Sequence, residues 1–129
     1  MTRTALIVED EIFVALDLER ILEEAGYQVR AIAADRESAL AAADGCSLAF
    51  VDINLRDGPS GPGIARTIAE QHGVKVVFVT ANPAQIDDAP ALGYIRKPFS
   101  ETAVRAAAAF AAGEPTDPMP DELVLRARQ

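Results

Sequence analysis

Residues 47–56, with the sequence SLAFVDINLR, constrain the fold of this chain more than any other stretch. An apolar run from Leu48 to Val51 stops at the carboxylate of Asp52, and a segment rich in glycine and proline follows at 57–63. A short apolar run with these boundaries is typical of a buried strand in a parallel sheet. Ligands bind beyond the carboxyl ends of such strands, so Asp52 is predicted to lie at a functional edge.

Apolar runs alternate with amphipathic segments along the rest of the chain. Strands are predicted at 4–8, 27–33, 48–52, 75–80 and 93–96. Helices are predicted at 14–25, 35–43, 62–72 and 100–112, with Asp35 and Ser100 as N-caps. The stretch 81–92 has two prolines and no helical stripe, which favours a loop or one irregular helical turn. This alternation predicts an α/β fold with a doubly wound, five-stranded parallel sheet.

The C-terminal stretch 113–129 differs in composition from the rest. Three prolines, one glycine and two acidic residues fall within 113–120, which is typical of a linker-like tail. Residues 122–128 are predicted to form at most a weak helical turn, because so short a helix is unstable alone. We therefore expect one domain over 1–112 and a proline-rich tail over 113–129 that holds no effector domain.

Composition narrows the range of partners and cell compartments. The 129 residues suffice for one domain with a buried core, and the net charge of −8 disfavours direct binding to nucleic acid or to an anionic membrane. No apolar run is long enough to cross a bilayer, so membrane insertion is not expected. The single cysteine, Cys46, cannot form an internal disulfide and suits the reducing cytoplasm, where we expect the protein to work.

Side chains of several types are predicted to meet at the carboxyl edge of the sheet. The residues that follow or end its strands are Glu9, Asp10, Asp52, Thr80 and Lys97. Three carboxylates at close range repel one another and favour a bound cation, and oxygen ligands suit Mg²⁺. An anionic acceptor, a divalent cation, a hydroxyl and an ammonium group are the parts that phosphoryl transfer requires.

Four motifs in order along the chain carry a resemblance to a known family: LIVEDE, FVDINL, VVFVTAN and KPFS. With helices between them, residues 3 to about 112 resemble the receiver domains of two-component response regulators. The resemblance implies a flavodoxin-like three-layer sandwich in which Asp52 accepts a phosphoryl group from a sensor histidine kinase or a histidine phosphotransfer protein. It also implies that Mg²⁺ is bound by Asp10, by Asp52 and by the backbone carbonyl of Asn54, with Glu9 acting directly or through water.

The resemblance assigns roles to residues of the later strands as well. Thr80 would hydrogen-bond the phosphoryl oxygen, Lys97 would ion-pair with it, and Tyr94 stands where the family often has an aromatic switch residue. The bond between Lys97 and Pro98 is expected to be cis. Because the segment between Thr80 and Lys97 is short for a receiver, the fourth helix region is expected to be shortened.

These residues are compatible with three functions to different degrees. The favoured one is a receiver that signals by phosphorylation-dependent binding of a downstream protein or by onward phosphorelay, without being an enzyme in the usual sense. The alternative is a phosphatase that forms an aspartyl phosphate, but such enzymes resemble a pattern with a second Asp where this chain has Asn54, which cannot exchange a proton. Mononucleotide binding is disfavoured because the acidic stretch 9–12 lacks glycine.

Overall fold

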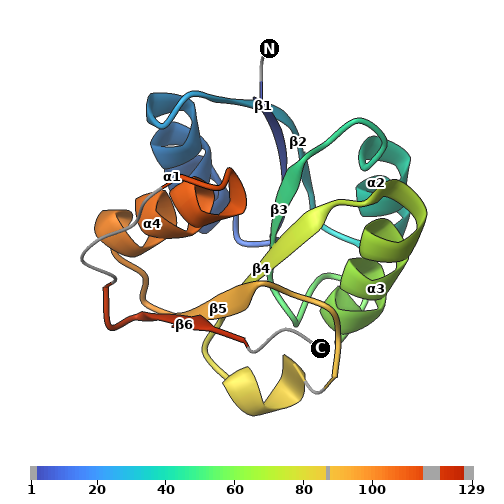
Figure 1. Cartoon of the computed structure of the whole chain (residues 1–129). Helices are drawn as coiled ribbons and strands as arrows, with labels where there is room; N and C mark the ends of the chain where they lie inside the picture. Colours follow the sequence, from blue (N-terminus) through green and yellow to red (C-terminus); the bar gives the residue numbers. More distant parts are fainter. Residues whose placement is uncertain (1–2, 87, 115–119, 127–129) are drawn as a thin grey trace.

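The computed structural model describes residues 3–86, 88–114 and 120–126 as a sheet covered by helices on both faces (Figure 1). The strands are β1 (Arg3–Val8), β2 (Tyr27–Ala33), β3 (Leu48–Val51), β4 (Lys75–Thr80), β5 (Gly93–Arg96) and β6 (Leu123–Leu125). The helices are α1 (Ile12–Glu24), α2 (Arg36–Ala42), α3 (Gly61–His72) and α4 (Glu101–Ala111). A 3₁₀ turn, Pro83–Ile86, lies between β4 and β5.

The strands follow the order β2-β1-β3-β4-β5-β6, and the first five are parallel. Helices α1 and α4 cover one face, while α2 and α3 cover the other (Figure 1). Strand β3 lies in the middle with all four of its residues buried. The predicted α/β class and doubly wound parallel sheet are thus confirmed, and the helix layers make the expected three-layer sandwich.

Local sequence signals explain where several elements begin and end. The Asp35 side chain accepts a hydrogen bond from the Ser38 N–H at 2.9 Å, and the Ser100 hydroxyl accepts one from the Ala103 N–H at 3.1 Å. Both predicted N-caps are therefore confirmed, and each satisfies an N–H that has no partner within its helix. Helix α3 ends at Gly73, whose φ of 67° is in the left-handed region that glycine adopts without strain.

The prediction for the C-terminal segment was wrong. Residues 123–125 form the antiparallel strand β6 beside β5, in place of a helical turn, so the sheet has six strands and not five. The backbone of β5 would otherwise present an open edge, and Leu123 gains a buried position in the core beneath α4. Residues 115–119 and 127–129 of the expected tail lie outside the described residues.

The segment between β4 and β5 is as short as predicted. Among its described residues, 81–86 and 88–92, the regular structure is the turn Pro83–Ile86, and Ile86 and Ala89 are buried against the face of the sheet that α3 covers. The prediction of a loop or one irregular helical turn is confirmed. No helix in the described part of the chain combines the length and the apolar character that a membrane span needs.

Gly61, the first residue of α3, packs against the strand end that carries Asp52. A Cβ at this position would overlap the carbonyl oxygen of Asp52 and lie 2.6 Å from the Cα of Ile53. We expect Gly61→Ala to lower the free energy of unfolding by about 1–3 kcal/mol, the usual cost of overpacking. Urea denaturation measures the change.

The matched control is Gly63→Ala, two residues along the same helix. A Cβ there would meet only the Arg36 side chain, at 3.5 Å, which is an ordinary contact. Because alanine favours the helix over glycine by up to about 1 kcal/mol, this variant is expected to be as stable as the parent chain or more stable. Equal destabilisation by both substitutions would contradict the packing argument.

Candidate functional site

The carboxyl ends of β1 and β3 bring two acidic segments side by side. Val8 and Val51, the last residues of these neighbouring strands, are partners in the sheet. Just beyond them, the Glu9 N–H donates to Ala33 O and the Asp52 N–H donates to Val8 O, both at 2.8 Å. The backbone therefore fixes where each acidic side chain leaves the sheet.

Three carboxylates form a cluster at this edge, hereafter the acidic cluster: Glu9, Asp10 and Asp52. Ligand oxygens of all three lie within 4.8 Å of one another. Glu9 is only 2% exposed and Asp52 only 8%, whereas Asp10 is exposed to solvent. Burial raises the pKa of Glu9 to about 7; the Asp52 charge acts in the same direction, while a hydrogen bond from Lys97 opposes the rise. The site therefore holds a surplus of negative charge that a cation would relieve.

Lys97 reaches the acidic cluster from the end of β5. Its Nζ lies 3.0 Å from Glu9 Oε1, 3.0 Å from Asp52 Oδ2 and 3.3 Å from Glu11 Oε2. Burial of the ammonium works against its charge, but the hydrogen bonds with Glu9 and Asp52 outweigh burial and raise the pKa of Lys97. The peptide bond from Lys97 to Pro98 is cis, as expected. Lys97 is thus held charged against the acidic cluster.

The remaining predicted residues lie on neighbouring elements at or near this edge. Thr80 ends β4 and is buried; its Oγ1 accepts a hydrogen bond from the Asn82 N–H at 2.9 Å. Asn54 follows Asp52 in the loop after β3 and is exposed, and its side-chain amide donates to Gln85 Oε1 at 3.1 Å. Tyr94 lies within β5, half-buried on the face of the sheet that carries α2 and α3.

Two features of the site were not predicted. Glu11 is a third acidic partner of Lys97, and its own N–H donates to Glu9 Oε2 at 3.1 Å, just before the start of α1. The run Glu9-Asp10-Glu11 was visible in the sequence, but it gave no sign of which side chain turns toward Lys97. The second feature is the Ile53 N–H, which donates to Asp52 Oδ1 at 2.7 Å. A backbone contact of this kind leaves no signal in the side-chain pattern.

This arrangement suits a hard divalent cation. The acidic cluster offers only carboxylate oxygens, the exposed position of Asp10 leaves one side open to water, and Mg²⁺ prefers a few carboxylates together with water ligands. The Asp52 carboxylate already has one oxygen on an ammonium and the other on a backbone N–H. A nucleophilic carboxylate oriented in this way beside a cation site can accept a transferred group.

Known proteins of similar sequence are bacterial regulators. The phyllosphere-induced regulator PhyR of Methylorubrum extorquens is 34% identical over 112 residues, which cover 82% of this chain and 42% of that protein. The aerobic respiration control protein ArcA of Escherichia coli is 36% identical over 110 residues, which cover 78% of this chain and 45% of that protein. The chain thus spans less than half the length of these two relatives.

A solved structure extends the similarity to the fold. The solution structure of the receiver domain of PhyR from Erythrobacter litoralis superposes with a TM-score of 0.81 at 31% identity, covering 92% of this chain and 96% of that one. The model of the response regulator receiver domain matches residues 5–109. Receiver domains are signalling modules that accept a phosphoryl group on an aspartate, and these matches lend no support to the phosphatase alternative. The chain therefore belongs to the response regulator receiver domain family.

Proposed function

We propose that Asp52 accepts a phosphoryl group from a sensor histidine kinase or a histidine phosphotransfer protein in a Mg²⁺-dependent reaction. The observation that carries this proposal is the position of the Asp52 carboxylate. It stands at the end of the buried strand β3 with Oδ2 against the Lys97 ammonium, Oδ1 against the Ile53 N–H, and two more carboxylates beside it. The carboxylate is thus oriented by two donors and lies next to a site for a cation.

The proposed metal ligands are Asp10, Asp52 and the backbone carbonyl of Asn54, with Glu9 bound directly or through water. When bound, Mg²⁺ neutralises charge on the phosphoryl oxygens. The Asp52 carboxylate attacks phosphorus as the bond from phosphorus to the donor histidine nitrogen breaks, and the imidazole leaves with that electron pair. Asp52 needs no general base for this attack, because a carboxylate carries no proton at neutral pH.

Lys97 and Thr80 are proposed to hold the product. The Lys97 Nζ already lies 3.0 Å from Asp52 Oδ2, so it can follow the added charge as an ion pair with the phosphoryl group. The Thr80 hydroxyl accepts a hydrogen bond from the Asn82 N–H and keeps its own proton to donate to a phosphoryl oxygen. Tyr94 is proposed to respond as the aromatic switch residue from its half-buried position on β5.

Asn54 favours a signalling role over rapid turnover. Hydrolysis of the aspartyl phosphate requires a water that gives up a proton, and an amide cannot take it. The Asn54 amide is moreover held by Gln85, at 3.1 Å. We expect autophosphorylation and slow loss of the phosphoryl group, with the output being binding of a downstream protein or relay to another histidine. We also propose that the protein works in the cytoplasm, where its expected phosphoryl donors act.

The assignment of Asp52 is tested by intact mass after incubation with acetyl phosphate and Mg²⁺. The parent chain is expected to gain the mass of one phosphoryl group, and chelation of Mg²⁺ should prevent the gain. Asp52→Asn should not react, because an amide oxygen is a poor nucleophile. Asp44→Asn, which changes an exposed aspartate outside the acidic cluster, serves as the control and should react like the parent. Equal phosphorylation of Asp52→Asn would reject the assignment.

The assignment of the metal ligands is tested by Mg²⁺-dependent stability. Since Mg²⁺ would bind the folded chain, it should raise the free energy of unfolding by about 2.7 kcal/mol at a concentration 100 times its Kd. Asp10→Asn is expected to weaken Mg²⁺ binding by at least about ten-fold, the lower end of the effect of even outer contacts in metal sites. Urea titrations across a range of Mg²⁺ concentrations give both values.

The control for the metal experiment is again Asp44→Asn, which should bind Mg²⁺ with the parent Kd. Asp10→Asn also removes one charge from the acidic cluster, so its stability without Mg²⁺ is expected to rise slightly or stay unchanged. An Mg²⁺ response that is identical in Asp10→Asn and in the parent chain would show that the ion binds elsewhere.

A further inference from the structure

Strand β6 covers the edge of β5 with a short segment of the chain. Leu123, Val124 and Leu125 pair with Ile95, Tyr94 and Gly93, respectively. Figure 1 shows β6 in red alongside β5, at the side of the sheet away from β2. Residues 123–126 thus occupy a row of backbone N–H and C=O groups that would otherwise be open to another strand.

The hold of β6 on the core is weak. Leu123 is buried at 5% exposure, but Val124 and Leu125 are 41% and 36% exposed, although both are large apolar residues. A strand of three residues with one buried side chain contributes few apolar contacts. Segments of this kind open locally at much lower free energy than the whole domain. Release of β6 therefore leaves the parallel sheet and its two helix layers intact.

The edge of β5 is nevertheless shaped to receive β6. A Cβ on Gly93 would overlap the carbonyl oxygen of Val124 and lie 3.0 Å from the Cα of Leu125. Glycine allows this close backbone approach, which a larger residue would prevent. Gly93 therefore allows the backbone of β6 to lie very close to β5 at this position.

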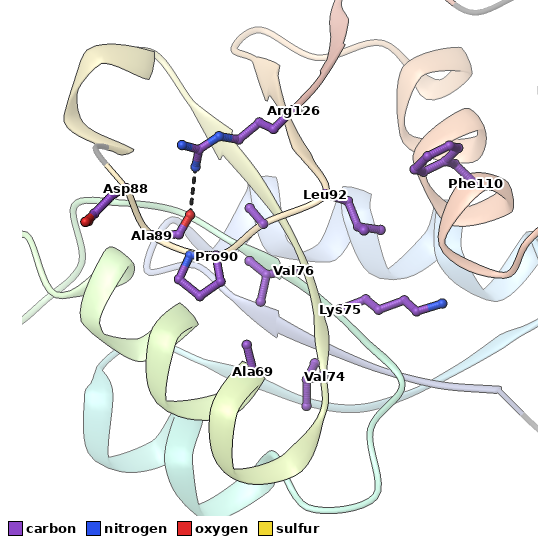
Figure 2. A pocket seen from close by; sticks show the side chains of 11 residues that line it. Ala69, Val74, Lys75, Val76, Asp88, Ala89, Pro90, Leu92, Phe110 and Arg126 are labelled. Carbon is purple, nitrogen blue, oxygen red and sulfur yellow. Dashed lines mark hydrogen bonds between the residues drawn. The ribbon is translucent and has the colours of Figure 1, made fainter. Parts of the chain in front are cut away.

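Side-chain contacts secure both ends of the segment. The Ser100 hydroxyl donates to Glu122 Oε1 at 2.9 Å, just before β6. Just after it, the Arg126 N–H donates to Leu92 O at 2.8 Å. The Arg126 Nη1 donates to Ala89 O at 2.7 Å, as the dashed line in Figure 2 shows. These last three residues also line a cavity of about 420 Å³ at the end of the sheet opposite the acidic cluster.

The same piece of chain that seats β6 also carries Lys97. Residues 93–95 pair with β6, Lys97 contacts Asp52 and Glu9, and Ser100 bonds Glu122. Lys97 lies two residues after Ile95 and three before Ser100. Lys97 and the residues that contact β6 thus lie within one short segment, with no intervening element.

We propose that β6 is a displaceable strap whose seating on β5 depends on the chemical state of Asp52. This inference rests on the proposed phosphorylation of Asp52, and release of β6 is the structural change that phosphorylation would cause. The Ser100–Glu122 contact holds β6 and lies three residues after Lys97, so we expect the response to a phosphoryl group to be release. The added charge draws the Lys97 ammonium away from Glu9 and Glu11, and the moving segment 97–100 breaks the contact between Ser100 and Glu122.

Coupling of this kind is reciprocal, so the proposal predicts a second effect that can be measured at Asp52. If the occupied site favours release, then release must favour occupation of the site by the same factor. Glu122→Ala removes the contact with Ser100 without touching the acidic cluster. It should loosen β6 in the free chain and strengthen binding at Asp52.

The experiment is amide hydrogen exchange on the whole chain with and without beryllofluoride and Mg²⁺, a mimic of the phosphoryl group. We expect the amides of 93–95 and 123–126 to exchange about five-fold faster or more when the mimic is bound. Glu122→Ala should show faster exchange there without the mimic and bind beryllofluoride more tightly. Glu114→Ala is the matched control, because it breaks an exposed ion pair with Arg3 and leaves the contacts of β6 in place.

The outcomes of this experiment test the release of β6 separately from the proposed phosphorylation of Asp52. Protection of the Ile53 amide by beryllofluoride reports binding at Asp52, whose Oδ1 accepts that N–H. Protection at Ile53 without any change at 93–95 and 123–126 would overturn the strap and leave the phosphorylation proposal standing. No protection at Ile53, together with no gain of mass from acetyl phosphate, would overturn the proposed function and the strap with it.

Discussion

Electrostatic repulsion among the carboxylates of Glu9, Asp10 and Asp52 is the constraint on which the rest of this structure depends. Their ligand oxygens lie within 4.8 Å of one another, and two of the three side chains are buried. Burying charge without a partner is costly, so the arrangement persists only because Lys97 lies between Glu9 and Asp52 and because packing elsewhere overcomes the remainder. The same unfavourable charge makes the site receptive to a divalent cation.

The topology of the sheet places these groups together. Strands β1 and β3 are neighbours at the centre, so the acidic residues beyond their ends meet without any long loop, and β4 and β5 follow in order with Thr80 and Lys97. Rigid strand ends hold a site more firmly than loops do. The chain departs from a plain five-stranded receiver in the shortened connection between β4 and β5, whose Gln85 contacts Asn54, and in the added strand β6.

The parallel sheet and most of the residues at the site could be predicted, because both leave strong local patterns in the sequence. The strands 27–33, 75–80 and 93–96 were predicted with the bounds that the structure has, and the strand-end acids needed only the rule that parallel strands end at one edge. Strand β6 was not predicted because Leu-Val-Leu is too short to show the alternation of apolar and polar residues that marks a strand. Its pairing also depends on the open edge of β5, which the sequence does not show. The contacts of Glu11 with Lys97 and of Asn54 with Gln85 depend likewise on side-chain directions that one sequence does not specify.

The central claim is that the acidic cluster and Lys97 form one site for a cation and a phosphoryl group. A crystal structure with Mg²⁺ and beryllofluoride tests it most directly. We expect beryllium bonded to Asp52, Mg²⁺ ligated by the carboxylates of Asp10 and Asp52, and the Lys97 ammonium in contact with a fluorine atom. Beryllofluoride or Mg²⁺ bound away from Asp52, with Lys97 still held between Glu9 and Asp52, would contradict it.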